Sequence, residues 1–236
     1  MSNLRSTAIP VTDPSAGLRI TEIFYSLQGE ANDAGLPTVF IRLTGCPLRC
    51  VYCDTTYSFE GGKRQSLAQI IEQTQQFNAP CICVTGGEPL AQPNCIPLLK
   101  QLCDLGYRVS LETSGAMDVS KVDERVSKVM DLKTPSSGEE KRNLYSNLEY
   151  LTAHDQIKFV ISHRDDYEWA KQQVAQHNLA NLVGCVWFSP AFAIEKGAVK
   201  LPDLARDLAQ WILDDHLPVR FQLQLHKLLW NDETGR

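Results

Sequence analysis

The sequence has no apolar run that approaches the roughly 20 residues needed to cross a bilayer. The first 17 residues, MSNLRSTAIPVTDPSAG, contain no apolar stretch of the kind that a secretory signal carries. We therefore expect a cytoplasmic protein with no membrane partner, and we interpret residues 1–17 as a mobile N-terminal lead-in.

An excess of basic residues is also missing, because 23 Lys and Arg stand against 28 Asp and Glu. The net charge of -5 disfavours a nucleic-acid partner, since such a surface needs a basic face. No internal repeat or low-complexity tract is present, and 43% of the 236 residues are hydrophobic. This composition is ordinary for a globular enzyme, and we expect residues 18–236 to form one domain.

Strand and helix patterns alternate along most of the chain. Strand patterns occupy residues 38–43, 81–84, 107–113, 127–132, 156–162, 184–189 and 219–225. Helical patterns occupy residues 67–77, after a capping box of Ser66 and Gln69, and residues 93–106, 165–178 and 201–216. Such alternation indicates βαβ units and a parallel sheet, as an open doubly wound sheet or as a partial barrel.

Residues 134–150 have no partner strand, and we interpret them as a lid or a helix over the active face. Polar motifs directly follow four of the strand patterns. They are TGGEP at 85–89, ETSG at 112–115, DLKTP at 131–135 and the Ser-Pro pair at 189–190. Because the carboxyl ends of parallel strands build the active face of α/β proteins, we expect one composite site.

Three of the eight cysteines, Cys46, Cys50 and Cys53, fall within eight positions of the stretch GCPLRCVYCDT. Cytoplasmic thiols stay reduced, so the cluster indicates a metal site. Three thiolates can bind three irons of a 4Fe–4S cube and leave the fourth iron open to a small molecule. A zinc site, which needs four protein ligands, is the alternative, completed by His154, His163 or another cysteine.

These motifs resemble those of radical S-adenosylmethionine (SAM) enzymes, which share the three-cysteine spacing, an aromatic before the last cysteine and a GGEP loop. Over nearly the whole chain the sequence is similar to the 7-carboxy-7-deazaguanine synthase family. The similar stretches are ITEIFYSLQGE at 20–30, FIRLTGCPLRCVYCDT at 40–55, TGGEP, ETSG and QLHK at 224–227. The resemblance implies an incomplete TIM-like barrel of roughly six parallel strands with helices outside.

The resemblance also implies the activity. It would be a lyase that converts 6-carboxy-5,6,7,8-tetrahydropterin to 7-carboxy-7-deazaguanine with loss of ammonia, in queuosine-type deazapurine biosynthesis. The implied cofactors are a 4Fe–4S cluster, SAM and Mg²⁺, and the implied partners are an electron donor such as flavodoxin or ferredoxin and a second copy of the chain. No catalytic side chain is implied, because SAM carries the radical.

Site residues follow from the resemblance position by position. Cys46, Cys50 and Cys53 would hold the cluster and Thr55 the Mg²⁺. The substrate contacts would be Leu27, Gln28, Gly29, Arg42 and Thr85, and the SAM contacts Tyr52, Gly87, Glu112, Ser114, Lys133, Thr134 and Pro135.

Arg42 is also indicated by the strand pattern, which places it opposite Val39, Ile41 and Leu43. Its guanidinium suits the substrate carboxylate, and pairing with a nearby Glu is the alternative. His226 and Lys227 are further candidates, whereas we interpret Lys158 and His163 as structural or surface groups.

Two other functions stay open on the sequence alone. One is a radical SAM activase that makes a glycyl radical on a partner protein. The other is a zinc or iron–sulfur module without catalytic activity.

Overall fold

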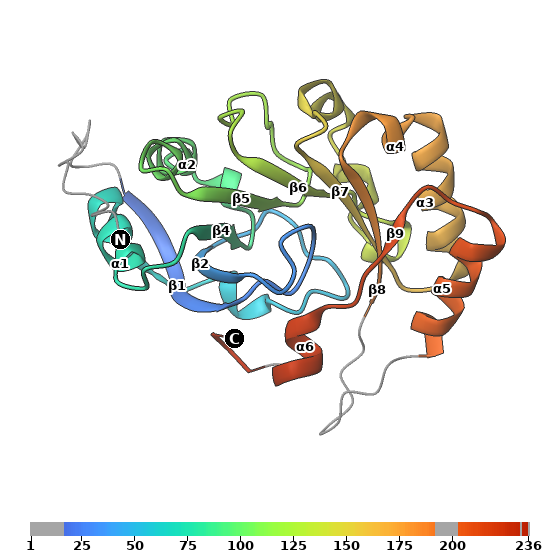
Figure 1. Cartoon of the computed structure of the whole chain (residues 1–236), viewed down its shortest axis with the longest axis horizontal. Helices are drawn as coiled ribbons and strands as arrows, with labels where there is room; N and C mark the ends of the chain where they lie inside the picture. Colours follow the sequence, from blue (N-terminus) through green and yellow to red (C-terminus); the bar gives the residue numbers. More distant parts are fainter. Residues whose placement is uncertain (1–16, 192–202, 232, 236) are drawn as a thin grey trace.

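The computed structural model describes residues 17–191, 203–231 and 233–235. These residues form one nine-stranded sheet in the order β3-β1-β2-β4-β5-β6-β7-β8-β9 (Figure 1). The strands are β1 (Gly17–Leu27), β2 (Pro37–Leu43), β3 (Lys63–Ser66), β4 (Cys81–Gly86), β5 (Arg108–Thr113), β6 (Ser127–Asp131), β7 (Gln156–Ile161), β8 (Cys185–Pro190) and β9 (Arg220–Phe221).

Every neighbouring pair from β2 to β9 is parallel, whereas β1 and β3 add an antiparallel edge. The predicted incomplete barrel of parallel strands is therefore confirmed. The helices are α1 (Leu67–Gln75), α2 (Cys95–Asp104), α3 (Arg164–Gln176), α4 (Leu179–Leu182), α5 (Asp203–Asp214) and α6 (Leu225–Trp230).

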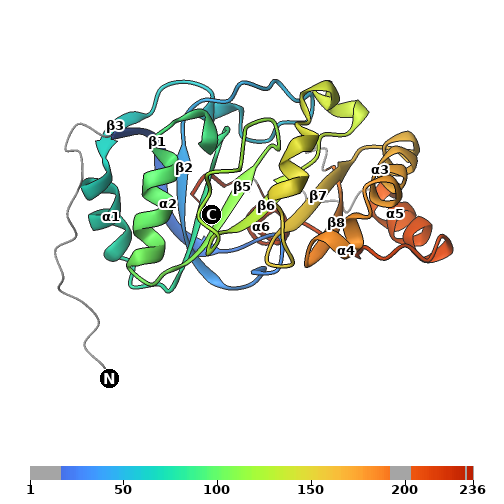
Figure 2. The same ribbon diagram turned by 90° about the horizontal axis from the view of Figure 1, so that it is seen from above.

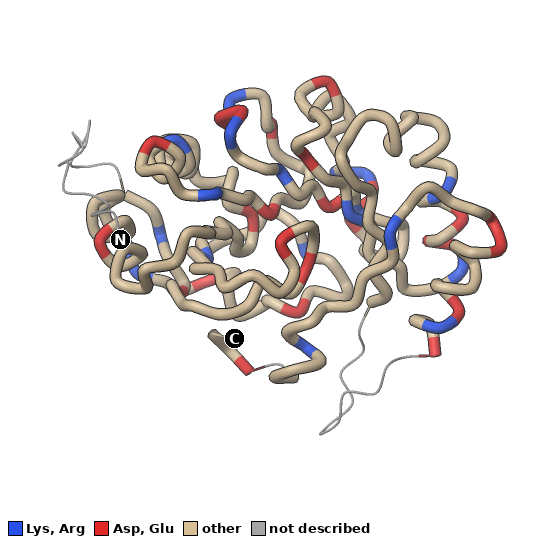
Figure 3. Tube along the Cα trace, viewed as in Figure 1, with Lys and Arg blue, Asp and Glu red and all other residues tan. Residues whose placement is uncertain are grey.

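The helices divide into groups along the sheet. Figures 1 and 2 show α1 and α2 beside one half of the sheet and α3, α4 and α5 beside the other half, with α6 apart from both groups. The predicted capping box is present at the start of α1, where Ser66 Oγ accepts from the Gln69 amide and Gln69 Oε1 accepts from the Ser66 amide. Lys, Arg, Asp and Glu are interspersed along the outer elements rather than sorted by sign (Figure 3).

Two strands, β1 and β3, lie outside the predicted patterns. β1 carries a bulge between Ile20 and Glu22 where it pairs with β2. The bulge shifts the alternation of inward and outward residues, so a period of two does not continue through the strand. The predicted lead-in covers residues 1–16, which lie outside the described residues, and Gly17, which begins β1.

The predicted last strand at 219–225 is wrong beyond its first residues, because only Arg220 and Phe221 pair with β8. From Gln224 the chain instead bonds to the loop after β1 and begins α6. The Leu225 amide donates to Gly29 O at 3.0 Å, the length of an ordinary hydrogen bond. Because β9 is an edge strand with one neighbour, these tertiary contacts decide its length.

Residues 134–150 form three short 3₁₀ helices, η3 (Pro135–Ser137), η4 (Glu140–Arg142) and η5 (Tyr145–Tyr150). They do not line the pocket described below, so the predicted lid is not what they form. The Val51 amide donates to Ser137 O at 3.0 Å, and the Arg49 amide donates to Glu139 Oε1 at 2.5 Å. The segment therefore stabilises the cysteine loop through hydrogen bonds to its backbone.

Each parallel strand separates an apolar side from a polar side. On the helix-covered side, Ile41 of β2, Val84 of β4 and Leu111 of β5 join one buried cluster with α1 and α2. Ile157 and Phe159 of β7 join a second buried cluster with α3 and α5. The intervening residues face the opposite side, where the polar groups gather.

A buried ion pair fastens β6 to the start of β7. Lys128 Nζ lies 3.0 Å from Asp155 Oδ1, and the two side chains are 5% and 0% exposed. Asp155 also accepts hydrogen bonds from the Lys128 and Thr152 amides. Asp155 therefore fixes both β6, through Lys128, and the loop that precedes β7, through Thr152.

We expect Asp155→Ala to lower the free energy of unfolding by about 3–5 kcal/mol, because it leaves a buried ammonium without its partner. Urea unfolding of the cluster-free protein measures this change. Lys100→Ala, which breaks an exposed pair with Asp104, is the control and should change stability by less than about 1 kcal/mol. Equal effects of the two substitutions would contradict the importance given to Asp155.

Candidate active site

A pocket opens at the carboxyl ends of the parallel strands. All four polar motifs that follow the strand patterns contribute to it, so the predicted composite site is confirmed as a geometric arrangement. The lining includes Thr85, Gly86 and Gly87 after β4, Glu112, Thr113 and Ser114 of β5 and its end, Asp131 and Lys133 at the end of β6, and Ser189 and Pro190 at the end of β8.

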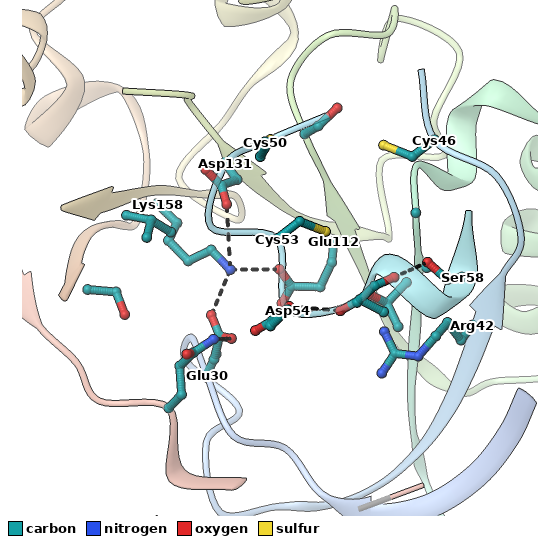
Figure 4. Close-up of a pocket in the computed structure, with 18 of the residues that line it drawn as sticks. Glu30, Arg42, Cys46, Cys50, Cys53, Asp54, Ser58, Glu112, Asp131 and Lys158 are labelled. Carbon is teal, nitrogen blue, oxygen red and sulfur yellow. Dashed lines mark hydrogen bonds and ion pairs between the residues drawn. The ribbon is translucent and has the colours of Figure 1, made fainter. Parts of the chain in front are cut away.

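The three cysteines of the loop after β2 also line this pocket, and none of them is in a disulfide (Figure 4). Burial raises the pKa of the Cys50 thiol to about 11 and also raises that of Cys46. A metal that binds these sulfurs must therefore displace their protons. Three thiols on one loop that lines one pocket are the ligand set of the open 4Fe–4S arrangement.

The described residues contain no group of three His, Cys, Asp or Glu side chains gathered closely enough for a single metal ion. His154 Nε2 contacts Arg125 O, and His163 Nε2 contacts Ser136 Oγ. Neither histidine lines the pocket. The alternative zinc site with one of them as fourth ligand therefore finds no support in this geometry.

The TGGEP loop packs directly on the cysteine loop. The Glu88 amide donates to Gly45 O at 2.8 Å, and a Cβ atom at Gly87 would lie 2.3 Å from the same oxygen. Only glycine fits so close an approach. The Glu88 carboxylate is fully buried and accepts from the Ser114 amide at 2.7 Å, which ties TGGEP to ETSG.

Lys158 lies at the floor of the pocket among three carboxylates (Figure 4). Its Nζ atom is 2.6 Å from Glu30 Oε2, 3.6 Å from Glu112 Oε2 and 3.9 Å from Asp131 Oδ2. Lys133 Nζ adds a second cation 3.0 Å from Asp131 Oδ2. Among the described residues Asp131 Oδ1 is buried without a hydrogen-bond partner, which suits a ligand that donates one.

The carboxylates of this cluster differ in charge. Burial favours the neutral form of Glu30, but Lys158 and His226 hold its pKa at about 2. Burial raises the pKa of Glu112 to about 7, and the repulsion from Glu30 and Asp131 adds to the effect against the attraction of Lys158. Burial disfavours charge on Lys158, yet the carboxylates raise its pKa. Of Glu30 and Glu112, only Glu112 therefore has a pKa near neutral pH.

Arg42 pairs with a nearby Glu, as the alternative interpretation expects, and it also lines the pocket. Its Nε atom donates to Glu22 Oε1 at 2.7 Å, and its guanidinium lies over the Phe24 and Tyr57 rings at 5.7 and 5.8 Å. Within residues 17–191, 203–231 and 233–235, its two terminal nitrogens have no hydrogen-bond acceptor. Because Arg42 lines the pocket, that pair of nitrogens can bind a carboxylate.

The QLHK segment contacts two loops, the one after β1 and the one that carries the cysteines. The Gln224 amide side chain donates to Glu30 Oε1 at 2.8 Å, and His226 lies against Gly29, where a Cβ atom would come within 2.1 Å of Nδ1. Lys227 Nζ lies 2.7 Å from Asp54 Oδ2. Although burial opposes ionisation, Lys227 holds the pKa of Asp54 well below its usual range.

Most of the site residues expected from the sequence come together in this pocket. Three of them do not line it. Gly29 packs behind His226, and Pro135 begins η3. Thr134 is buried, and its hydroxyl shares a hydrogen bond of 3.3 Å with the Tyr52 hydroxyl. Those that line it are Leu27, Gln28, Arg42, Cys46, Cys50, Tyr52, Cys53, Thr55, Thr85, Gly87, Glu112, Ser114 and Lys133.

Lys158 is not a surface group, because it is buried and lines the pocket, and its ion pairs with three carboxylates agree with the structural interpretation. His163, given the same interpretation, is exposed. Asp131 begins the DLKTP motif, and the sequence alone indicates no role for it. Both Lys158 and Asp131 occupy strand positions that alternate with buried apolar residues, and this alternation is the sequence signal that indicates an inward-facing charge.

Comparison with known proteins agrees with this site. Residues 40–167, a little over half of the chain, match the model of the radical SAM superfamily. The chain is therefore a radical SAM protein.

Curated relatives narrow the class further. The chain is 45% identical over 226 residues to the 7-carboxy-7-deazaguanine synthase of Koribacter versatilis, covering 92% of this chain and 99% of the relative. It is 43% identical over 222 residues to that of Chlorobaculum tepidum, covering 93% and 97%. The chain belongs to the 7-carboxy-7-deazaguanine synthase family.

A solved structure shares the fold. The crystal structure of QueE from Escherichia coli superimposes with a TM-score of 0.71 at 23% identity, over 89% of this chain and 95% of that one. No helix in the described part of the chain is long and apolar enough to span a membrane.

The raised pKa of Glu112 predicts a pH-dependent stability difference. Between about pH 4.5 and 7 the unfolded chain loses this proton while the folded protein keeps it, so the contribution of Glu112 to stability falls as pH rises. Glu112→Gln removes that loss. Relative to the unmodified protein, the ligand-free variant should gain on the order of 2 kcal/mol between pH 5 and pH 8.

Urea unfolding at both pH values measures the gain, and groups that both proteins share cancel in the difference. Glu149→Gln, at an exposed position, is the matched control and should show no such gain. A stability difference for Glu112→Gln that stays constant with pH would contradict the assignment of the proton to Glu112.

Proposed function

We propose that this protein converts 6-carboxy-5,6,7,8-tetrahydropterin to 7-carboxy-7-deazaguanine with loss of ammonia. The observation that carries the proposal is the shared pocket of the three-cysteine loop, Arg42 and the carboxylates around Lys158. One half of the pocket suits a cluster and SAM, and the other half suits a small, carboxylated, hydrogen-bonding substrate. The similarity to curated synthases over more than nine-tenths of the chain supports the same conclusion.

The cysteine side of the pocket binds the cofactors. When bound, a 4Fe–4S cluster on Cys46, Cys50 and Cys53 together with SAM supplies the carbon radical that removes a hydrogen atom from the substrate. The protein's own groups hold SAM in one orientation. We assign this role to five lining residues, Tyr52, Gly87, Glu112, Ser114 and Lys133. Thr134 and Pro135, which do not line the pocket, would act only through the residues beside them, as Thr134 does through its contact with the Tyr52 hydroxyl.

The opposite side binds the substrate. Arg42 pairs its terminal nitrogens with the substrate carboxylate, while Glu22 fixes the rest of the guanidinium. We assign the other substrate contacts to Leu27, Gln28 and Thr85, which line the same side, and to Gly29, which packs behind His226. Glu30, at the end of SLQGE, accepts hydrogen bonds from the aminopyrimidinone edge. Phe24 and Phe40, stacked with centroids 4.9 Å apart, form the apolar wall.

Mg²⁺ takes oxygen ligands and keeps waters and substrate oxygens. We assign Thr55 to this cation. Its hydroxyl donates to Asp54 Oδ1 at 2.8 Å, so the lone pairs of Thr55 Oγ remain available. The QLHK segment excludes water from the finished site, which a carbon radical requires.

We further propose one domain over residues 18–236, a cytoplasmic location, a homodimer, and an electron donor of the flavodoxin or ferredoxin type. A single continuous sheet supports the one-domain assignment. Eight free cysteines and an oxygen-sensitive cluster suit a reducing compartment. Light scattering on the intact chain tests the dimer, and reduction of the cluster by purified flavodoxin or ferredoxin tests the donor.

The activity is tested anaerobically with reconstituted cluster, SAM, Mg²⁺, a reductant and 6-carboxytetrahydropterin. We expect the deazaguanine product by mass. Formation of 5′-deoxyadenosine without product would keep the radical chemistry and move the activase to first place. Cys46→Ala should lose both cluster and turnover, and turnover without the cluster would contradict the whole assignment.

Arg42→Lys should weaken binding of the pterin carboxylate by about tenfold to a hundredfold and leave iron content unchanged, because an ammonium loses the two-point geometry. Substrate titration of the reconstituted enzyme measures the affinity. The control is tetrahydropterin without the 6-carboxylate, which should bind the variant and the unmodified enzyme equally. Equal losses for both compounds would remove Arg42 from the carboxylate.

A further inference from the structure

A continuous chain of contacts runs from the C-terminal helix to the proposed Mg²⁺ ligand. Lys227 Nζ lies 2.7 Å from Asp54 Oδ2, and the other oxygen of the same carboxylate accepts from the Thr55 hydroxyl at 2.8 Å. Lys227 is the third residue of α6, and its side chain is only 8% exposed. An ammonium this well buried must keep a carboxylate partner, so the contact fixes the position of Asp54.

The direction of the Thr55 hydrogen bond decides what the cation meets. Because the proton of Thr55 is engaged by Asp54, its oxygen presents only lone pairs to the pocket. An Asp54 carboxylate that rotated away would release that proton and allow the hydroxyl to turn. Groups that orient a metal ligand in this way typically change metal affinity by 10–100-fold when removed.

The same helix is docked by independent contacts. The Leu225 amide donates to Gly29 O at 3.0 Å, and Gln224 Nε2 donates to Glu30 Oε1 at 2.8 Å. Residues 224–227 therefore connect the substrate side of the pocket with the cation side. When α6 is docked, Lys227 is held at Asp54, and when it is not, the orientation of Thr55 is lost.

We propose that Lys227 is a positioning residue for the Mg²⁺ site, which acts through Asp54 on Thr55 and makes cation binding depend on docking of the C-terminal helix. The proposal rests on the proposed assignment of Mg²⁺ to Thr55. It opposes the simplest electrostatic expectation, in which a nearby ammonium only repels a divalent cation. By linkage, the cation must in turn favour the docked helix by the same factor.

Mn²⁺ serves as the probe for the cation. Its electron paramagnetic resonance signal in solution decreases on binding, and the oxidised 4Fe–4S enzyme with SAM and substrate is titrated without turnover. We expect Lys227→Gln to bind Mn²⁺ about tenfold more weakly and Lys227→Arg, which keeps the charge, to stay within about threefold of the unmodified enzyme. Lys171→Gln, which breaks a partly exposed pair between Lys171 of α3 and Asp215 after α5, is the matched control and should leave Mn²⁺ affinity unchanged.

A second measurement separates positioning from a general loss of folding. Hydrogen exchange in residues 225–230 should slow when Mn²⁺ is added to the unmodified enzyme, and this effect should be lost in Lys227→Gln, while β4 and β5 keep their protection in both. Unchanged or tighter Mn²⁺ binding by Lys227→Gln would overturn the proposal, as would loss of protection throughout the sheet. Product formation by the unmodified enzyme tests the proposed function separately, so the two failures are distinguishable.

Discussion

The buried ammonium of Lys158 is the contact on which the pocket depends. Three carboxylates come within 3.9 Å of it, and they reach this position from the loop after β1 and from the ends of β5 and β6. Without a cation such carboxylates repel one another and pay the full cost of leaving water, several kcal/mol for each ion. Lys158 therefore joins segments that are distant in sequence into one floor.

The alternation of the strands makes this arrangement possible. Lys158 lies between Ile157 and Phe159, which are fully buried against the helices on the other side of β7. The same strand thus anchors the core with one face and carries the charge with the other. An incomplete barrel also leaves its two edges unpaired, and α6, rather than a longer β9, covers the gap beside the pocket. Gln224, His226 and Lys227 are consequently part of the site.

The sequence predicts the elements whose signal is local. The cysteine spacing, the motifs after the strands, and strands with a clean period of two needed no tertiary information. The bulge in β1 hid its alternation, and the contacts of Gln224 and Leu225 with the loop after β1 shortened β9. The sequence does not indicate the place of Lys158 in the pocket, because its three partners lie 27 to 128 residues away. A charged residue in an apolar strand needs a partner of opposite charge, but the sequence alone does not show which residue that partner is.

Each cation of the pocket is already paired with a carboxylate of the protein, so a ligand can enter without leaving a buried charge unpaired. Arg42, Lys133, Lys158 and Lys227 each contact a carboxylate of the protein, respectively Glu22, Asp131, Glu30 and Asp54. The pocket is thus charge-paired before any ligand binds, and a ligand must add to these pairs or exchange partners with them.

Arg42 can add a carboxylate without releasing Glu22, because only its Nε atom is engaged. A divalent cation at Thr55 adds positive charge beside Asp54, which Lys227 already neutralises in part. The charge that balances the new cation must then come from the ligand itself. A carboxylated substrate and Mg²⁺ are therefore complementary occupants of one pocket, and each lowers the electrostatic cost of admitting the other.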